Sequence, residues 1–152
     1  MLKKAIAIFI SFFSTFAYGN DMGTPRSLVQ TFISDYQKWN DKAHSLSEAE
    51  VEYTGEAMKM AQNLYHKNII SKYCKPNFKG QPIAFGSDSS HDSEHEVILT
   101  EEIDGDNAII TTQHTDSNNF VADYEYRLIK ENGRWYLEAV DYVDSDGKYP
   151  GL

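Results

Sequence analysis

Apolar residues recur at helical spacing after residue 24, and they define the first predicted element. Those on one helix face, at steps of four or three, are Leu28, Phe32, Tyr36 and Trp39. Thr24 followed by Pro25 is typical of a helix start, because threonine caps free amide groups and proline at the first position needs no amide partner. The pattern predicts a helix over about residues 25–43 with one buried aromatic face.

A second helical pattern follows after a short polar stretch. Ser47 and Glu50 have the spacing of a capping box, in which each side chain satisfies the other residue's free amide group. The helix is expected over about residues 48–73, with Gly55 bending or dividing it and Pro76 marking its end. Its apolar face consists of Met58, Ala61, Tyr65 and Ile69.

The second half of the chain alternates apolar and polar residues with a period of two, which predicts strands. The expected strands are residues 82–86, 96–103, 108–114, 120–129 and 134–143. Asp104-Gly105 and Asn132-Gly133 fall between strands, and both dipeptides favour tight hairpin turns. Helices followed by an antiparallel meander predict an α+β domain, with the N-terminal helices packed on one face of a curved antiparallel sheet.

The first 19 residues have the pattern of a signal peptide. Lys3 and Lys4 precede an apolar run, and Ala17 and Gly19 place small residues before a cleavage site at Asn20. The run is too short for a membrane span, which needs roughly 20 apolar residues. We therefore expect a leader at 1–19, a single domain at 20–152, a periplasmic or secreted location, and no membrane insertion after cleavage.

Charge and cysteine content narrow the partners. Loss of Lys3 and Lys4 with the leader, which has no acidic residue, changes the net charge from −9 to −11. This surface repels phosphate backbones, so nucleic acid is not expected as a partner, whereas a basic protein would be attracted. Cys74 is the only cysteine, so no intrachain disulfide can form in an exported chain.

Two acidic segments have partial metal-site patterns. The loop over residues 87–96 contains His91 and His95 among four carboxylates, but it has no thiolate and its spacing suits a helix rather than a loop. The segment 141–147 has an Asp-x-Asp-Gly pattern, but the chain ends before the glutamate that closes a calcium loop. We predict a solvated acidic connection, a charged turn-rich tail, and neither a metal nor a cofactor.

A third group has the residue types of an acid–base pocket. If the sheet curls around the first helix, some of these side chains could line a pocket in which one of them abstracts a proton. The residues are Asp35, Tyr36, His114, Asp123, Tyr124 and Trp135. No general base is singled out among them, so no catalytic residue is assigned and a non-enzymatic role is preferred.

Candidate contacts for a protein partner lie on the last strands and the tail. Tyrosine is a good interface anchor, and carboxylates complement a basic partner. These candidates are Asp123, Glu125, Tyr136, Glu138, Asp141, Tyr142, Asp144 and Asp146.

Several local runs resemble those of the nuclear-transport-factor-2-like fold, and within it the immunity proteins of bacterial polymorphic toxin systems, including those beside Rhs-type toxins. The resemblance covers about residues 24–152. The runs that carry it are Thr24-Pro25 leading into Phe32-Ile33-Ser34-Asp35-Tyr36 with Trp39, Ile70-Ser71-Lys72-Tyr73-Cys74, Ala84-Phe85-Gly86-Ser87, Tyr126-Arg127-Leu128, Gly133-Arg134-Trp135-Tyr136 and Tyr149-Pro150-Gly151-Leu152. None of these runs is a catalytic signature.

The resemblance implies a cystatin-like cone of sheet around helices, and a protein that neutralises a cognate toxin by binding it. The leader would then place the encounter outside the cytoplasm. Pairing of two copies through the open sheet face is a further implication of the fold. The alternatives are a small-ligand-binding or isomerase- and dehydratase-like enzyme that uses the cone interior, and an exported accessory domain.

Overall fold

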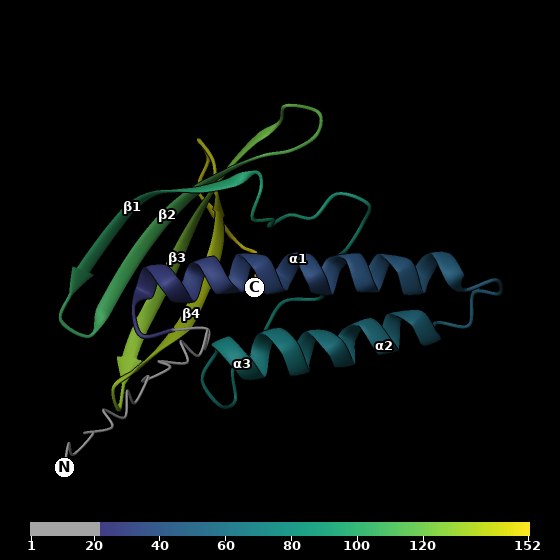
Figure 1. Ribbon diagram of the computed structural model, residues 1–152, viewed down its shortest axis with the longest axis horizontal. Coiled ribbons are helices and arrows are strands. Elements are labelled where there is room, and N and C mark those ends of the chain that lie inside the picture. Colours follow the sequence, from purple (N-terminus) through teal and green to yellow (C-terminus); the bar gives the residue numbers. More distant parts are fainter. Residues whose placement is uncertain (1–21) are drawn as a thin grey trace, which may run out of the picture.

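The structure is a computed structural model that describes residues 22–152 (Figure 1). The predicted leader over residues 1–19 lies outside the described residues. The helical elements are α1 (Pro25–Ala49), α2 (Glu56–Tyr65), the π-helical turn η1 (His66–Ile70) and α3 (Ser71–Tyr73). The strands are β1 (Glu96–Asp104), β2 (Asn107–Thr115), β3 (Val121–Glu131), β4 (Arg134–Val143) and β5 (Lys148–Pro150). None of the helices described is long and apolar enough to cross a membrane.

Helix α1 begins where the sequence predicts and ends later. Thr24 accepts a hydrogen bond from the Ser27 amide at 3.1 Å, and Pro25 is the first helical residue. The predicted capping box of the second helix is wrong, because Ser47 lies inside α1. Glu50 instead ends α1, and its carboxylate accepts hydrogen bonds from the amides of Thr54 and Glu56. One side chain therefore shapes the whole turn between the two helices.

The second helical region begins at Gly55, which confirms that this glycine divides the helices. Its φ of +78° is a left-handed conformation that glycine adopts without steric cost. The region then runs without interruption through α2, η1 and α3 to Tyr73. Helices α1 and α2 form an antiparallel hairpin whose far end extends beyond the sheet (Figure 1).

The sheet is an antiparallel meander in the order β1-β2-β3-β4-β5. Asn132 and Gly133 have φ values of +51° and +80°, as a type I′ turn requires, and strand β4 has the predicted bounds. The predicted strand over residues 82–86 is absent, since that segment has no regular secondary structure in the described chain. Strand β5 was not predicted: after a turn at residues 144–147 the tail pairs with β4.

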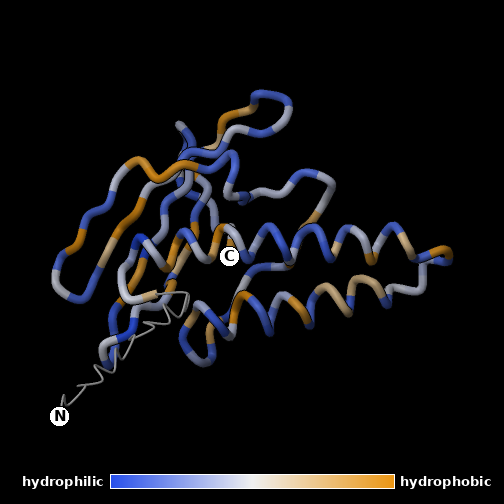
Figure 2. Tube along the Cα trace, viewed as in Figure 1, coloured by the Kyte–Doolittle hydropathy of each residue, from blue (hydrophilic) through white to orange (hydrophobic). Residues whose placement is uncertain are grey.

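The core lies between α1 and the concave face of this curved sheet, which confirms the predicted α+β architecture. The predicted face of α1 is buried along its whole length, and Trp39 donates a hydrogen bond to the Ala61 carbonyl at 2.9 Å. The strands contribute Ile110, Tyr126, Leu128, Trp135, Leu137 and Val140 to the same cluster. In Figure 2, hydrophobic and hydrophilic residues alternate along the strands, as expected for a sheet with one covered face.

Candidate functional site

The segment over residues 87–96 places three of its ionisable side chains in an interior polar network, so the prediction of a fully solvated acidic connection is wrong. His91, Asp92 and Glu96 are only 2%, 5% and 7% exposed. Periodicity does not reveal this burial, because it depends on α1, β2 and β3, which surround the segment. Buried ionisable groups require partners, and the structure supplies them in two clusters.

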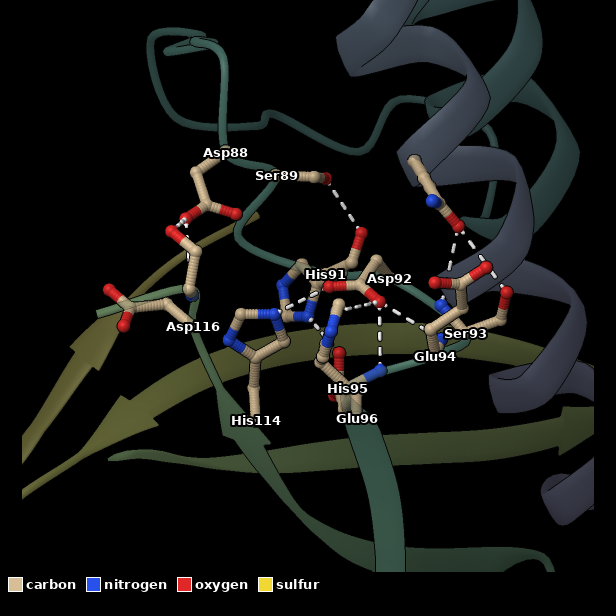
Figure 3. Close-up of polar contacts among 12 residues, drawn as sticks. Asp88, Ser89, His91, Asp92, Ser93, Glu94, His95, Glu96, His114 and Asp116 are labelled. Carbon is tan, nitrogen blue, oxygen red and sulfur yellow. Dashed lines mark hydrogen bonds and ion pairs between the residues drawn. The ribbon is translucent and has the colours of Figure 1, made fainter. Parts of the chain in front are cut away.

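A clamp on α1 holds the chain that leads into this segment. The buried Asn40 side chain donates to the Gly86 carbonyl at 2.9 Å and accepts from the Gly86 amide at 3.1 Å. Farther along, Ser117 donates to Asp88 at 2.7 Å (Figure 3). These contacts fix both the entry to the loop and its outer turn, so His91 enters the interior in one orientation.

The first cluster joins His91 and Glu96. His91 Nδ1 lies 2.8 Å from Glu96 Oε2 and 2.9 Å from the Tyr126 hydroxyl. Tyr126 donates to Glu96 Oε1 at 2.6 Å, and Thr112 donates to the same oxygen at 2.5 Å. Because the tyrosine proton is committed to Glu96, Nδ1 must carry the proton that it shares with both oxygens. Nε2 is the ring nitrogen that this cluster leaves without a partner.

These partners determine the ionisation of Glu96. Burial raises the pKa of the carboxyl, but the charge and hydrogen bond of His91 and the hydrogen bonds from Thr112 and Tyr126 outweigh burial and hold the pKa below its usual range. Glu96 is therefore a buried carboxylate anion near neutral pH. A carboxylate that fixes a histidine tautomer in this way orients the imidazole to accept a proton or a hydrogen bond.

The second cluster joins Asp92 to His95 and His114 (Figure 3). Asp92 Oδ2 lies 2.7 Å from His114 Nε2, and Oδ1 lies 2.9 Å from His95 Nδ1 and accepts the His95 amide at 2.8 Å. Burial raises the pKa of Asp92, whereas hydrogen bonds from His114 and from the His95 and Glu94 groups lower it, with a net decrease. This cluster closes the turn that leads into β1.

The proposed acid–base set is only partly brought together. Tyr36 and Tyr124 pack against His91, with ring centroids 4.8 and 4.4 Å from the imidazole. His114 belongs to the Asp92 cluster. His91, Glu96 and Tyr126 had no predicted role in this set, because they come from a loop, the start of β1 and the middle of β3. The alternation of Tyr124 and Tyr126 on one face of β3 was the available signal.

The other three members of that set lie elsewhere. Asp35 binds Lys72 at 2.5 Å and the Tyr73 hydroxyl at 2.8 Å, and Asp123 accepts from Gln113 on the face of the sheet away from the helices. Trp135 is buried beneath Lys130. Their roles are therefore in packing and ion pairing.

The carboxylates and imidazoles pair with each other rather than converging on one point. Among residues 22–152, no group of three or more histidine, cysteine or acidic side chains is arranged to hold a metal ion. In the tail, Asp144 Oδ1 accepts from the amides of Asp146 and Gly147, so this carboxylate closes a turn. Cys74 is buried, and burial raises its thiol pKa to about 12, so it is an inert packing residue.

The predicted partner-binding residues divide between two faces of the sheet. Asp123 and Glu125 lie on the outer face, which none of the helices of residues 22–152 covers (Figure 1). Glu125 binds Lys148 at 2.7 Å. Asp141 is buried and pairs with Arg127 at 3.2 Å, so it is poorly available to a partner. Tyr142 lies on the inner face, where its ring centroid is 6.0 Å from that of Tyr124.

The remaining candidates border the outer face. Tyr136 packs beneath the Arg134 guanidinium at 4.8 Å, and Glu138 is exposed with Lys75 at 4.0 Å. Asp144 and Asp146 are exposed in the turn before β5.

A comparison with protein families gives a match that spans nearly all of the described chain. A family model described as NTF2 fold immunity protein matches residues 24–150. The match covers helices α1, α2 and α3, the turn η1 and every strand of the sheet. The chain belongs to this family. Searches of curated proteins and of solved structures gave no significant match.

Membership of the NTF2 fold immunity protein family implies an immunity role. It also agrees with the observed architecture, in which helices pack on a curved sheet. The match confirms the resemblance drawn from the local sequence runs. It assigns no residue roles, so the His91–Glu96 cluster and the outer face are interpreted from their own geometry.

Proposed function

We propose that the protein is an exported immunity protein that neutralises a cognate toxin by direct protein–protein binding. The observation that carries this proposal is the family match over residues 24–150. A binding role requires no catalytic group. It agrees with the structure, in which the buried histidines and carboxylates form hydrogen bonds with one another.

Export is part of the proposal because of the leader pattern. Two lysines, a short apolar run and small residues before Asn20 have the order of a cleavable signal peptide. An immunity protein in the periplasm meets a toxin that acts there or enters by that route. The cell wall and the membrane are the targets accessible to such a toxin.

The outer sheet face is the proposed docking surface. It is formed by antiparallel strands that no helix in the described part of the chain covers (Figure 1). It exposes Asp123 beside the partly paired Glu125. Tyr136 and Glu138 border it on β4. With a net charge of −9, which becomes −11 after loss of Lys3 and Lys4, the protein attracts a basic toxin surface.

The test is to co-express the protein with the toxin-like product of the adjacent reading frame and to purify the complex. We expect a complex whose calorimetric affinity falls at least tenfold in the double variant Asp123→Lys and Glu138→Lys, because rim charges of the wrong sign repel the partner. The matched control is Glu48→Lys with Glu52→Lys, at the far end of the helical hairpin. Failure to form a complex would refute toxin binding, and equal losses in both variants would refute the assignment to the outer face.

Pairing of two copies through the same face is the competing use of this surface. Light scattering of the purified protein separates the two uses. A monomer leaves the face available to a toxin, whereas a dimer that dissociates in the Asp123→Lys variant assigns the face to self-association.

A further inference from the structure

A cavity opens beside His91 at the end of the sheet where the tail returns. Its volume is about 260 Å³, and its walls include Tyr36, Tyr65, Ile83, Tyr124 and Tyr142. None of its lining residues, all of which belong to the described part of the chain, carries a carboxylate, an ammonium or a guanidinium group. The space is therefore aromatic and without fixed charge.

His91 presents an unpaired ring nitrogen to this cavity. The side chain is nine-tenths buried, and Nδ1 is turned toward Glu96 and Tyr126. Nε2 has no hydrogen-bond partner among residues 22–152, although every inaccessible side-chain nitrogen or oxygen in that range has one. Nε2 must therefore be open to the cavity that His91 lines, and it is available for a hydrogen bond with a group from outside the chain.

The surrounding rings stay neutral. Burial raises the pKa of Tyr36 to about 12, although a hydrogen bond with Ser90 opposes the increase, and burial and the nearby Glu96 charge raise the pKa of Tyr124. The Glu96 carboxylate is already engaged by His91, Thr112 and Tyr126, so it does not offer a free anion to the cavity. Neither an anionic nor a cationic ligand would find its counter-charge here.

We propose that this cavity binds a small uncharged ring compound with a hydroxyl group, of the phenol class, whose hydroxyl forms a hydrogen bond with His91 Nε2. An apolar cavity of about 150 Å³ holds a benzene molecule, so this volume accommodates a substituted single ring. The aromatic walls favour edge or offset ring contacts, and the unpaired imidazole nitrogen supplies a directional interaction. The site is separate from the outer face and does not depend on toxin binding.

The experiment measures the binding of five probes to the purified protein by calorimetry at neutral pH. The probes are p-cresol, toluene, benzoate, benzylamine and N-acetyltyrosine amide. We expect saturable binding of p-cresol at one site, about tenfold tighter than toluene because of the hydrogen bond of its hydroxyl group, and weaker binding of both ions. No saturable p-cresol binding, no preference over toluene, or tighter binding of either ion would overturn the proposal. N-acetyltyrosine amide binding as tightly as p-cresol would also overturn it, because the cavity would then suit a partner's tyrosine.

Two variants locate the site. His91→Phe should keep toluene binding and lose the preference for p-cresol. Ala84→Phe, at an exposed lining position, should abolish binding of both without disturbing the core, whereas Ala49→Phe at the end of α1 is the matched control and should bind as the original protein does. If His91→Phe fails to fold, the p-cresol preference of the unaltered protein and the loss in Ala84→Phe still decide the matter. Binding retained by Ala84→Phe would contradict the proposed location.

Discussion

His91 Nδ1 lies 2.8 Å from the Glu96 carboxylate in the interior of the domain, and the two residues are only five positions apart in the chain. Through this pair, the loop that follows the helices is held to the start of β1, the first strand of the sheet. The ionised state of the pair therefore contributes to holding the fold together.

The pair predicts a loss of stability in acid. The pKa of Glu96 is lower in the folded protein than its ordinary value of 4.5, so the folded state binds fewer protons than the unfolded state below that pH. The stabilisation is complete above about pH 4.5 and declines as the pH falls through the folded pKa. Urea denaturation at a series of pH values should show this decline.

Glu96→Gln removes one contribution to that decline. We expect the free energy of unfolding to decline less steeply with falling pH than in the original protein. Some of the decline should remain because of Asp35 and Asp92, whose pKa values are also lowered. The control is Glu102→Gln, on the exposed part of the same strand. The same decline in acid for Glu96→Gln and the original protein would contradict a lowered pKa of Glu96.

Tyr126→Phe tests the hydroxyl that serves both members of the pair. Its loss removes the 2.6 Å hydrogen bond to Glu96 and leaves a buried charge with one donor fewer. Hydrogen bonds to charged groups contribute about 1.5–3 kcal/mol, so the free energy of unfolding should fall by that amount. Tyr149→Phe, at an exposed position, is the matched control and should have little effect on the urea midpoint.

The sequence predicted the elements whose signals are local. Thr24-Pro25 determines the start of α1, Asn132-Gly133 determines the last hairpin, and the alternation along residues 134–143 gives the bounds of β4. Each of these depends on a few neighbouring residues. The Ser47–Glu50 box failed because an equally local alternative, the use of Glu50 as acceptor for Thr54 and Glu56, is preferred once α1 continues.

The candidate site depended on contacts that no local pattern contains. His91, Thr112 and Tyr126 come from a loop and two strands, and they meet only when the meander has formed. The loop itself is polar and lacks a period, which favours the interpretation of a solvated connection. Its burial follows from Asn40 and the helix on which that side chain lies, far away in the sequence.

Phe32→Ala tests the centre of the core. The ring is inaccessible and contacts the rings of Tyr73 at 5.4 Å, His91 at 5.6 Å and Tyr126 at 5.7 Å. Truncation of a buried phenylalanine costs about 3–5 kcal/mol, so the urea midpoint should fall sharply. Phe120→Ala, at an exposed position before β3, should change the free energy of unfolding by less than about 0.5 kcal/mol. Similar losses in both variants would contradict the position of Phe32 in the core.

Gly133→Ala tests the last hairpin. Gly133 has a φ of +80°, which an alanine adopts only with strain, so we expect a loss of about 1 kcal/mol or more in thermal or urea denaturation. Gly86→Ala is the matched control, since that position lacks a positive φ and a methyl group there would meet no atom within 4 Å. A neutral Gly133→Ala would contradict the type I′ turn.

We propose that the protein is exported and protects a cell from a toxin outside the cytoplasm. The most direct measurement is the survival of cells in which the toxin encoded beside the gene is directed to the periplasm, with either the full chain or a chain lacking residues 2–19. We expect survival with the full chain and death without the leader. Death with both chains, or equal protection by the chain without a leader, would contradict the proposal.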